Sequence, residues 1–299
     1  MRTPFTGAGT ALVTPFRRDG AIDEAAVRRL ARRQIDAGIH FLSPVGTTGE
    51  APTLSARERL RVIELVVSEA GGTVPVLAGA GGYDTREVIE FARDVERTGA
   101  DGLLSVTPYY NKPTAEGLYQ HFKAIAESTP LPIVLYNVPS RTAINLDVPT
   151  TARLAEIPNI VGLKAPGDLA QMSEVIRATA EDFIVLSGDD PVAVATMAVG
   201  GRGVVSVASN EAPREMAQIV ELCEKGDFAA ARTLHHWLLP LCQVNFVESN
   251  PGPCKAAMAA MGLLEEVYRL PLVPPSAGAR DKIMNVLQEL KLLGSAARV

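Results

Sequence analysis

The sequence predicts an α/β protein built as a (β/α)8 TIM barrel with a C-terminal helical appendage. Short apolar runs alternate with amphipathic stretches of helical period, and about eight such units fill the first 226 residues. Strand-like runs stop after that point and only helical stretches follow. We therefore expect a barrel carrying the active site over residues 1–226 and a helical region over residues 227–299.

The candidate strands are apolar runs bounded by glycine, proline or polar residues. Runs of this length between breakers are typical of buried strands. They are Gly9–Val13, Ile39–Ser43, Val74–Ala78, Gly102–Val106, Ile133–Tyr136, Ile160–Leu163, Ile184–Ser187 and Gly203–Val207.

N-terminal capping signals mark the helices between these runs. Asp23 precedes the first helical stretch, and Ser55 with Glu58 forms a capping box before the second. Asp84 with Glu87 resembles a similar start for the third. Later helices are expected near Thr114–Ser128, Pro149–Glu156, Leu169–Thr179, Pro191–Val199, Pro213–Lys225, Phe228–Cys242, Pro253–Met261 and Ala277–Leu293.

A doubly wound sheet is the alternative fold. That fold usually carries a G-x-G-x-x-G turn after its first strand. Here Thr14-Pro15-Phe16 follows the first run, and Gly79-Ala80-Gly81-Gly82 after the third lacks the lysine of a P-loop. The barrel is therefore favoured.

Composition argues against several classes of protein. With 29 basic and 34 acidic residues the net charge is −5, so there is no basic surplus for nucleic-acid binding. The three cysteines are odd in number and lack C-x-x-C spacing, which disfavours a disulfide framework and a zinc knuckle. We find neither a signal-peptide core nor an uncharged apolar run of about 18 residues. We expect a reduced, soluble, cytoplasmic protein.

Lys164 follows the sixth run and is the first candidate for chemistry. In a barrel of this type, the active site lies at the C-terminal ends of the strands. A lysine there can be a surface residue that begins a loop, and from the local sequence alone this is the simpler interpretation. If the side chain instead projects into a cleft, its partly desolvated amine becomes a nucleophile toward carbonyls.

Hydroxyls and one arginine follow the neighbouring runs. Thr47 and Thr48 lie between glycines, in a loop that either holds a small carboxylate or phosphate or is simply a tight turn. Tyr136 closes the fifth run, so its hydroxyl needs a partner. Arg141 is either a surface charge or a bidentate ligand for a carboxylate at the barrel mouth.

Two further loops leave alternatives open. Tyr109 and Tyr110 are either packing residues or a source of a phenolic proton. Asp189 and Asp190 are suited to binding a metal, but they also suit the start of a helix before Pro191. Since no candidate strand tip carries a histidine, metal-assisted hydrolysis is poorly supported, and we expect neither a metal nor a cofactor.

Together these residues suit a Schiff-base reaction. Lys164 would attack a ketone, and Tyr136 would move protons as the carbinolamine collapses. Thr47 and Thr48 would hold the carboxylate of a keto acid, and Arg141 would receive a second anionic substrate.

The residues, in this order, resemble the dihydrodipicolinate synthase/N-acetylneuraminate lyase superfamily of pyruvate-handling lyases. The resemblance covers nearly the whole chain, from the stretch Thr10–Phe16 to the segment Asn250-Pro251 and beyond. Its most specific motifs are Gly46-Thr47-Thr48-Gly49-Glu50, Tyr136-Asn137-Val138-Pro139 and Gly162-Leu163-Lys164.

The resemblance is closest to members that condense pyruvate with L-aspartate 4-semialdehyde in the diaminopimelate–lysine pathway. The loop Val106–Pro113 and the motif Ser140-Arg141-Thr142 carry this likeness. The resemblance implies that pyruvate forms a Schiff base with the lysine and that members are commonly homotetramers, each a dimer of dimers. By this resemblance, Lys164 is the nucleophile, and Tyr136, Thr47 and Tyr110 form a proton relay in which Tyr110 crosses a dimer interface. Thr48 binds the pyruvate carboxylate, and Arg141 binds the aldehyde substrate. The backbone at Gly188 and Val205 lines the pocket.

Two other functions fit parts of the same residue pattern. A sister lyase that cleaves N-acetylneuraminate or a 2-keto-3-deoxy sugar acid would use the same lysine and tyrosine, but a polyhydroxylated substrate favours hydroxyl partners over the cation of Arg141. A binding protein that kept the barrel and lost catalysis is disfavoured, because the whole reactive set is present.

The chain departs from the family pattern in two places. Ala165-Pro166-Gly167-Asp168 follows the lysine where a more acidic or hydroxyl-rich stretch is expected, which alters the pocket rim. Lysine-inhibited members carry His and Asn at positions matching Ala56, Arg59 and Tyr83, whereas Glu87 is retained. We therefore expect weak or absent feedback by L-lysine, because its ammonium would lose polar partners and meet Arg59.

Overall fold

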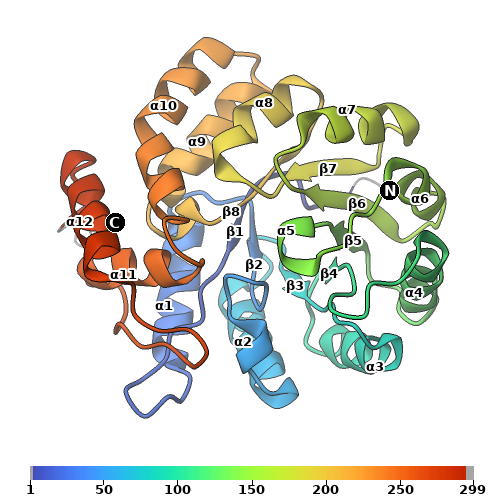
Figure 1. Cartoon of the computed structure of the whole chain (residues 1–299), viewed down its shortest axis with the longest axis horizontal. Helices are drawn as coiled ribbons and strands as arrows, with labels where there is room; N and C mark the ends of the chain where they lie inside the picture. The colour runs from blue at the N-terminus through green and yellow to red at the C-terminus, as the bar shows by residue number, and fades with distance from the viewer. Residues whose placement is uncertain (1–2, 294–299) are drawn as a thin grey trace.

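Eight parallel strands form the centre of the computed structural model, which describes residues 3–293 (Figure 1). They are β1 Gly7–Ala11, β2 Phe41–Ser43, β3 Leu77–Gly79, β4 Gly102–Val106, β5 Ile133–Tyr136, β6 Ile160–Ala165, β7 Ile184–Ser187 and β8 Gly203–Ser206. Their order is β2-β1-β8-β7-β6-β5-β4-β3. A parallel bridge between Leu42 and Val76 joins the two ends of this series, and the Leu42 amide donates to the Pro75 carbonyl at 2.9 Å. The predicted (β/α)8 barrel is confirmed.

Helices form a ring around the strands (Figure 1). The predicted caps are present: Asp23 accepts from the Ala26 amide, Ser55 and Glu58 form a reciprocal capping box, and Asp84 caps the third helix. The ring helices are α1 Glu24–Asp36, α2 Ala56–Ala70, α3 Thr85–Glu96, α4 Ala115–Glu127, α6 Val148–Ala155, α7 Leu169–Ala178, α8 Ala193–Ala198 and α9 Pro213–Glu224. Short helical turns follow four strands: η1 Ala51–Thr53, α5 Pro139–Thr142, η2 Asp190–Val192 and η3 Ala208–Asn210.

Three helices follow the barrel: α10 Phe228–Val244, α11 Gly252–Ala260 and α12 Ala277–Glu289. The division expected after residue 226 falls between α9 and α10, and the predicted region's last residues, 294–299, lie outside the described part. Leu238 and Leu241 of α10 are fully buried in the same apolar cluster as Val204 and Ala208 near β8. These helices therefore pack on the barrel, which the sequence had left open.

The core has two layers. Leu77, Leu104, Val134 and Leu186 fill the barrel interior, while a larger cluster lies between the strands and the surrounding helices. Interior side chains close the barrel below the strand tips, so the open space lies at their C-terminal ends.

The three cysteines form no disulfide with one another in the structure. Cys223, Cys242 and Cys254 are all buried and free. Within residues 3–293, no helix is both long and apolar enough to cross a bilayer.

Candidate active site

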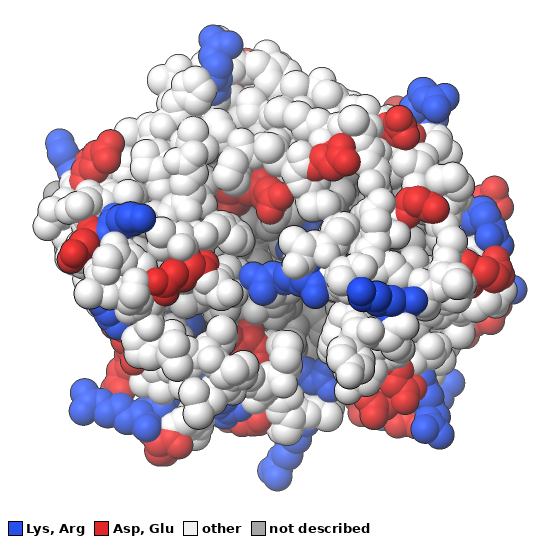
Figure 2. All heavy atoms as spheres, in the orientation of Figure 1, with Lys and Arg blue, Asp and Glu red and all other residues white. Residues whose placement is uncertain are grey.

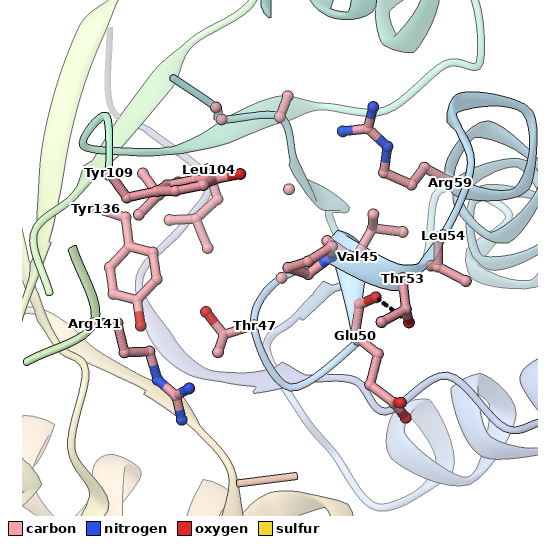
Figure 3. A pocket seen from close by; sticks show the side chains of 18 of the residues that line it. Val45, Thr47, Glu50, Thr53, Leu54, Arg59, Leu104, Tyr109, Tyr136 and Arg141 are labelled. Carbon is pink, nitrogen blue, oxygen red and sulfur yellow. Dashed lines mark hydrogen bonds between the residues drawn. The ribbon is translucent and has the colours of Figure 1, made fainter. Parts of the chain in front are cut away.

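A cavity of about 490 Å³ opens at the C-terminal ends of the strands. Figure 2 shows this face hollowed near its centre, with acidic and basic side chains spread around it and no large patch of one sign. Thr47 from the loop after β2, Tyr136 from β5 and Arg141 from α5 line one part of the cavity and point toward one another (Figure 3). The structure therefore brings together three of the residues predicted from the sequence.

Lys164 lies inside β6, although the sixth strand was predicted to end at Leu163. Its side chain is buried, with 6% of its surface exposed. Lys164 pairs in register with Tyr136 on the neighbouring strand, and its Nζ lies 4.2 Å from the centre of that ring. Among the described residues, no carboxylate forms an ion pair with Lys164. The amine is thus beside a phenol and free of an acidic partner.

Gly188, one of the two predicted lining positions, lies close to this lysine. A Cβ at Gly188 would lie 3.2 Å from Cε of Lys164 and 2.8 Å from the carbonyl oxygen of Ala165. Val205 is fully buried in the interior layer that includes Tyr136. A side chain at position 188 would therefore meet the Ala165 carbonyl and crowd Lys164.

The loop after β2 presents its two threonines differently. Thr47 points into the cavity (Figure 3), whereas Thr48 is almost completely buried and its Oγ1 accepts a hydrogen bond from Asn250 Nδ2 at 3.0 Å. The tight-turn alternative is also correct, because the Ala51 amide donates to the Gly46 carbonyl. The loop is a turn that also contributes to the cavity.

Asn250 is a site residue that the local sequence pattern did not single out. It lies before α11 in the C-terminal region, and Arg141 Nη2 donates to its carbonyl oxygen at 3.2 Å. Asn250 therefore contacts both Thr48 and Arg141. The C-terminal region also contributes Pro251, Pro271 and Leu272 to the cavity wall. In the sequence, Asn250 is marked only by the Asn250-Pro251 pair, which belongs to the family resemblance.

The two tyrosines after β4 have different environments. Tyr109 lines the cavity with its ring 5.1 Å from that of Tyr83, and burial raises its pKa. Tyr110 is 93% exposed and has a φ of 72°. It does not line the cavity of its own protomer, so one chain alone does not bring Tyr110 to the other predicted residues.

Asp189 and Asp190 bind backbone amides. Asp189 accepts from the Gly167 amide at 2.8 Å. Asp190 Oδ2 accepts from Val207 and Ala208 at 3.0 and 2.9 Å, and η2 begins at Asp190 as the helix-start interpretation expected. The pair thus ties together the loops after β6, β7 and β8. Among the described residues, no group of three or more His, Cys, Asp or Glu side chains could hold a metal ion.

Arg59 marks the other end of the cavity, opposite Arg141 in Figure 3. Its guanidinium lies 4.1 Å above the ring of Phe91, and Tyr83 and Glu87 line the same end. Burial lowers the pKa of Arg59. This end of the cavity thus carries a half-buried cation.

Comparisons with known proteins agree with this geometry. The family model described as "Dihydrodipicolinate synthetase family" matches residues 4–290. The chain is 51% identical over 292 residues to the 4-hydroxy-tetrahydrodipicolinate synthase of Koribacter versatilis, covering 97% of each chain. The dihydrodipicolinate synthase of Aquifex aeolicus has a TM-score of 0.95 at 42% identity, with 97% of this chain and 99% of that chain covered.

A third similar protein was crystallised with a small molecule. The dihydrodipicolinate synthase of Acinetobacter baumannii, solved as a complex with pyruvate, has a TM-score of 0.94 at 42% identity, with 96% of this chain and 99% of that chain covered. The family model spans nearly the whole chain, and the similar enzymes include one that is about half identical to it. The chain belongs to the dihydrodipicolinate synthetase family.

Proposed function

We propose that this enzyme is a 4-hydroxy-tetrahydrodipicolinate synthase, which condenses pyruvate with L-aspartate 4-semialdehyde through a Schiff base on Lys164. The observation that carries the proposal is the position of Lys164: a buried amine without an acidic partner, 4.2 Å from the ring of Tyr136. Thr47 and Arg141 open onto the cavity that Tyr136 also lines. The relatives of about half identity bear this enzyme's name.

In the first half of the reaction the neutral amine of Lys164 attacks the ketone carbon of pyruvate. The carbinolamine loses its hydroxyl as water, with a proton delivered through Tyr136, and an imine forms. Loss of a methyl proton then gives the enamine. Thr47 relays protons next to Tyr136, and the loop of Thr48 holds the pyruvate carboxylate.

In the second half the enamine carbon attacks the aldehyde of L-aspartate 4-semialdehyde. Arg141 binds the carboxylate of this substrate, since its guanidinium stands at the mouth and is oriented by Asn250. The new carbon–carbon bond leaves an imine, which the substrate's own amine attacks. Ring closure expels Lys164 and restores the free enzyme. No step requires a metal or a cofactor.

The oligomeric state and the cellular location are parts of the same proposal. A homotetramer built as a dimer of dimers would give the exposed Tyr110 a place in a neighbouring site, where it would complete the proton relay. Residues 1–226 would form the catalytic unit and residues 227–299 a supporting helical region, within a cytoplasmic enzyme. Analytical ultracentrifugation of wild type and Tyr110→Ala, with activity measured across the same concentrations, tests this arrangement.

The sister lyase acting on N-acetylneuraminate or a 2-keto-3-deoxy sugar acid is the function to exclude by experiment. Both enzymes form the same imine, so trapping does not separate them. The cation of Arg141 favours a second substrate with a carboxylate near the aldehyde. Turnover of L-aspartate 4-semialdehyde compared with the sugar acids decides between the two.

Borohydride reduction in the presence of pyruvate tests the central step. We expect mass spectrometry to find one reduced pyruvate adduct per chain, on the peptide containing Lys164. A peptide without modification, or an adduct on another lysine, would refute the mechanism.

A further inference from the structure

A fully buried ion pair lies behind the loop that carries Thr47 and Thr48. Lys255 Nζ is 2.6 Å from Glu50 Oε1, and neither side chain has any exposed surface. Glu50 belongs to the cavity wall, yet its side chain points away from the cavity (Figure 3). The reaction proposed above uses neither residue.

A contribution to folding stability does not by itself explain why this ion pair is buried. Burial raises the pKa of Glu50 and lowers the pKa of Lys255, because each charged form loses water, and the pairing opposes both shifts. A buried ion pair is often no more stabilising than apolar side chains of the same volume. What the pair supplies is a fixed geometry for the backbone to which it is attached.

The pair belongs to a network that holds the end of the loop. Lys255 Nζ also donates to the Thr14 carbonyl at 3.1 Å, and the Thr14 hydroxyl donates to the Gly49 carbonyl at 2.7 Å. One ammonium on α11 thereby contacts Glu50 directly and Gly49 through Thr14. Two adjacent residues that follow Thr48 are thus anchored from the C-terminal region.

The backbone of the loop requires an anchor of this kind. Val45 and Glu50 have φ values of 60° and 57°, a region that residues other than glycine rarely occupy. A Cβ at Gly49 would lie 2.9 Å from the Val45 amide nitrogen, so the loop closes tightly on itself. Conformations of this kind persist only where surrounding contacts hold them. Loss of the anchor would let the segment between Val45 and Glu50 relax.

We propose that Lys255 is a positioning residue for the pyruvate half of the reaction. Its ion pair with Glu50 and its hydrogen bond to Thr14 hold the loop on which Thr47 and Thr48 meet the substrate. Lys255 acts through that loop and does not touch pyruvate. The inference rests on the proposed function, because it assigns Thr47 and Thr48 their roles there.

Lys255→Met tests this inference, with Met258→Ala as the matched control. Met258 is fully buried on the same helix, in an apolar cluster, so its truncation destabilises α11 without touching the loop. We expect Lys255→Met to lower kcat/KM for pyruvate about tenfold and kcat/KM for the aldehyde by less than about twofold. In a ping-pong scheme each ratio reports its own half-reaction. Met258→Ala should lower Tm and leave both ratios near wild type.

Glu50→Gln and the double variant Glu50→Gln/Lys255→Met keep the inference testable if Lys255→Met folds poorly. Residues that act as one unit show non-additive effects, so the double variant should lose no more kcat/KM for pyruvate than the worse single variant. Additive losses, or equal losses in Lys255→Met and Met258→Ala at equal Tm, would overturn the positioning role. If wild type itself fails to trap pyruvate on Lys164, the proposed function fails instead.

Discussion

Two lysines in this barrel are buried beside aromatic rings but have opposite surroundings. Lys164 Nζ lies 4.2 Å from the ring centre of Tyr136, and Lys255 Nζ lies 4.3 Å from that of Phe16. Lys255 also has a carboxylate at 2.6 Å and a carbonyl oxygen at 3.1 Å. Lys164 has neither an ion pair nor a hydrogen bond to its amine among the residues described.

The difference separates a structural lysine from a reactive one. A carboxylate at hydrogen-bond distance stabilises the charged amine and occupies the space through which an electrophile would approach. The aromatic contact is common to both sites, so it does not define the nucleophile. We propose that the absence of an acid beside Lys164, together with the cavity that Tyr136 lines, makes Lys164 the nucleophile.

The largest expected effect comes from replacing the unpaired lysine. Lys164→Met should lower turnover roughly 10⁴-fold or more, because the covalent intermediate can no longer form. Its Tm should stay the same or rise, since no ion pair is lost and a buried amine is replaced by an apolar chain. The coupled assay and thermal unfolding measure the two quantities.

Lys255→Met is the matched comparison for stability. It leaves Glu50 buried without its partner, so we expect a loss of about 3 kcal/mol in the free energy of unfolding. Borohydride should still trap pyruvate on Lys164 in this variant. If both substitutions lowered Tm equally, the contrast between the two lysines would be wrong.

Arg141→Ala sharpens the comparison on the substrate side. The carboxylate of the aldehyde loses its guanidinium partner, so kcat/KM for L-aspartate 4-semialdehyde should fall about 100-fold. Trapping of pyruvate at saturation should be unchanged, because Lys164 keeps its surroundings. Steady-state kinetics and mass spectrometry of the trapped protein measure both. A variant that no longer trapped pyruvate would show that Arg141 also serves the first half.

The barrel could be predicted from the sequence because its strands are buried apolar runs between breakers. Every predicted run contains or overlaps an observed strand. The boundaries were less certain: β1 begins at Gly7, ahead of the predicted Gly9, and β6 continues through Lys164 to Ala165. Apolarity marks burial, whereas a strand ends where its hydrogen-bonded ladder ends, and polar residues such as Lys164 can belong to that ladder.

The site could be predicted in part, since strand tips in a barrel converge. This reasoning predicted Lys164, Tyr136, Thr47 and Arg141, and the structure places the last three on one cavity. The contact between Asn250 and Thr48 spans 202 positions, and no local pattern distinguishes Lys255 from a surface lysine on its helix. Both depend on how the C-terminal helices pack against the loop after β2, which only the three-dimensional structure provides.

A buried carboxylate offers a smaller test of the same electrostatic argument. Glu211 is buried beside Cys254 and Asn245, with Asp190 and Arg33 also near, and burial raises the pKa of Glu211 to about 8 from an ordinary 4.5. The folded state therefore holds a proton that the unfolded state releases between these values, so this contribution to stability falls as pH rises from about 4.5 to 8. Unlike Glu50, Glu211 forms no ion pair with a lysine in the described structure.

Glu211→Gln should remove this contribution to the pH dependence. Relative to wild type, the variant should gain about 2 kcal/mol in the free energy of unfolding between about pH 6.5 and pH 8.5. Chemical denaturation of both proteins at the two pH values measures the change. Parallel pH profiles would show that Glu211 titrates in its ordinary range.

The smallest expected effect concerns free L-lysine as a ligand. Its ammonium would need a carboxylate at hydrogen-bond distance, as Lys255 has in Glu50. At the distal end of the cavity Glu87 is available, but Arg59 lines the same wall and lies over Phe91. Repulsion from that guanidinium should keep inhibition below twofold at about 1 mM L-lysine. This concentration is roughly the upper end of the usual range of KM values. Arg59→His, largely neutral at pH 8, should increase inhibition. Strong inhibition of wild type would mean that the guanidinium turns away from the ligand, and Arg59→His would then leave inhibition unchanged.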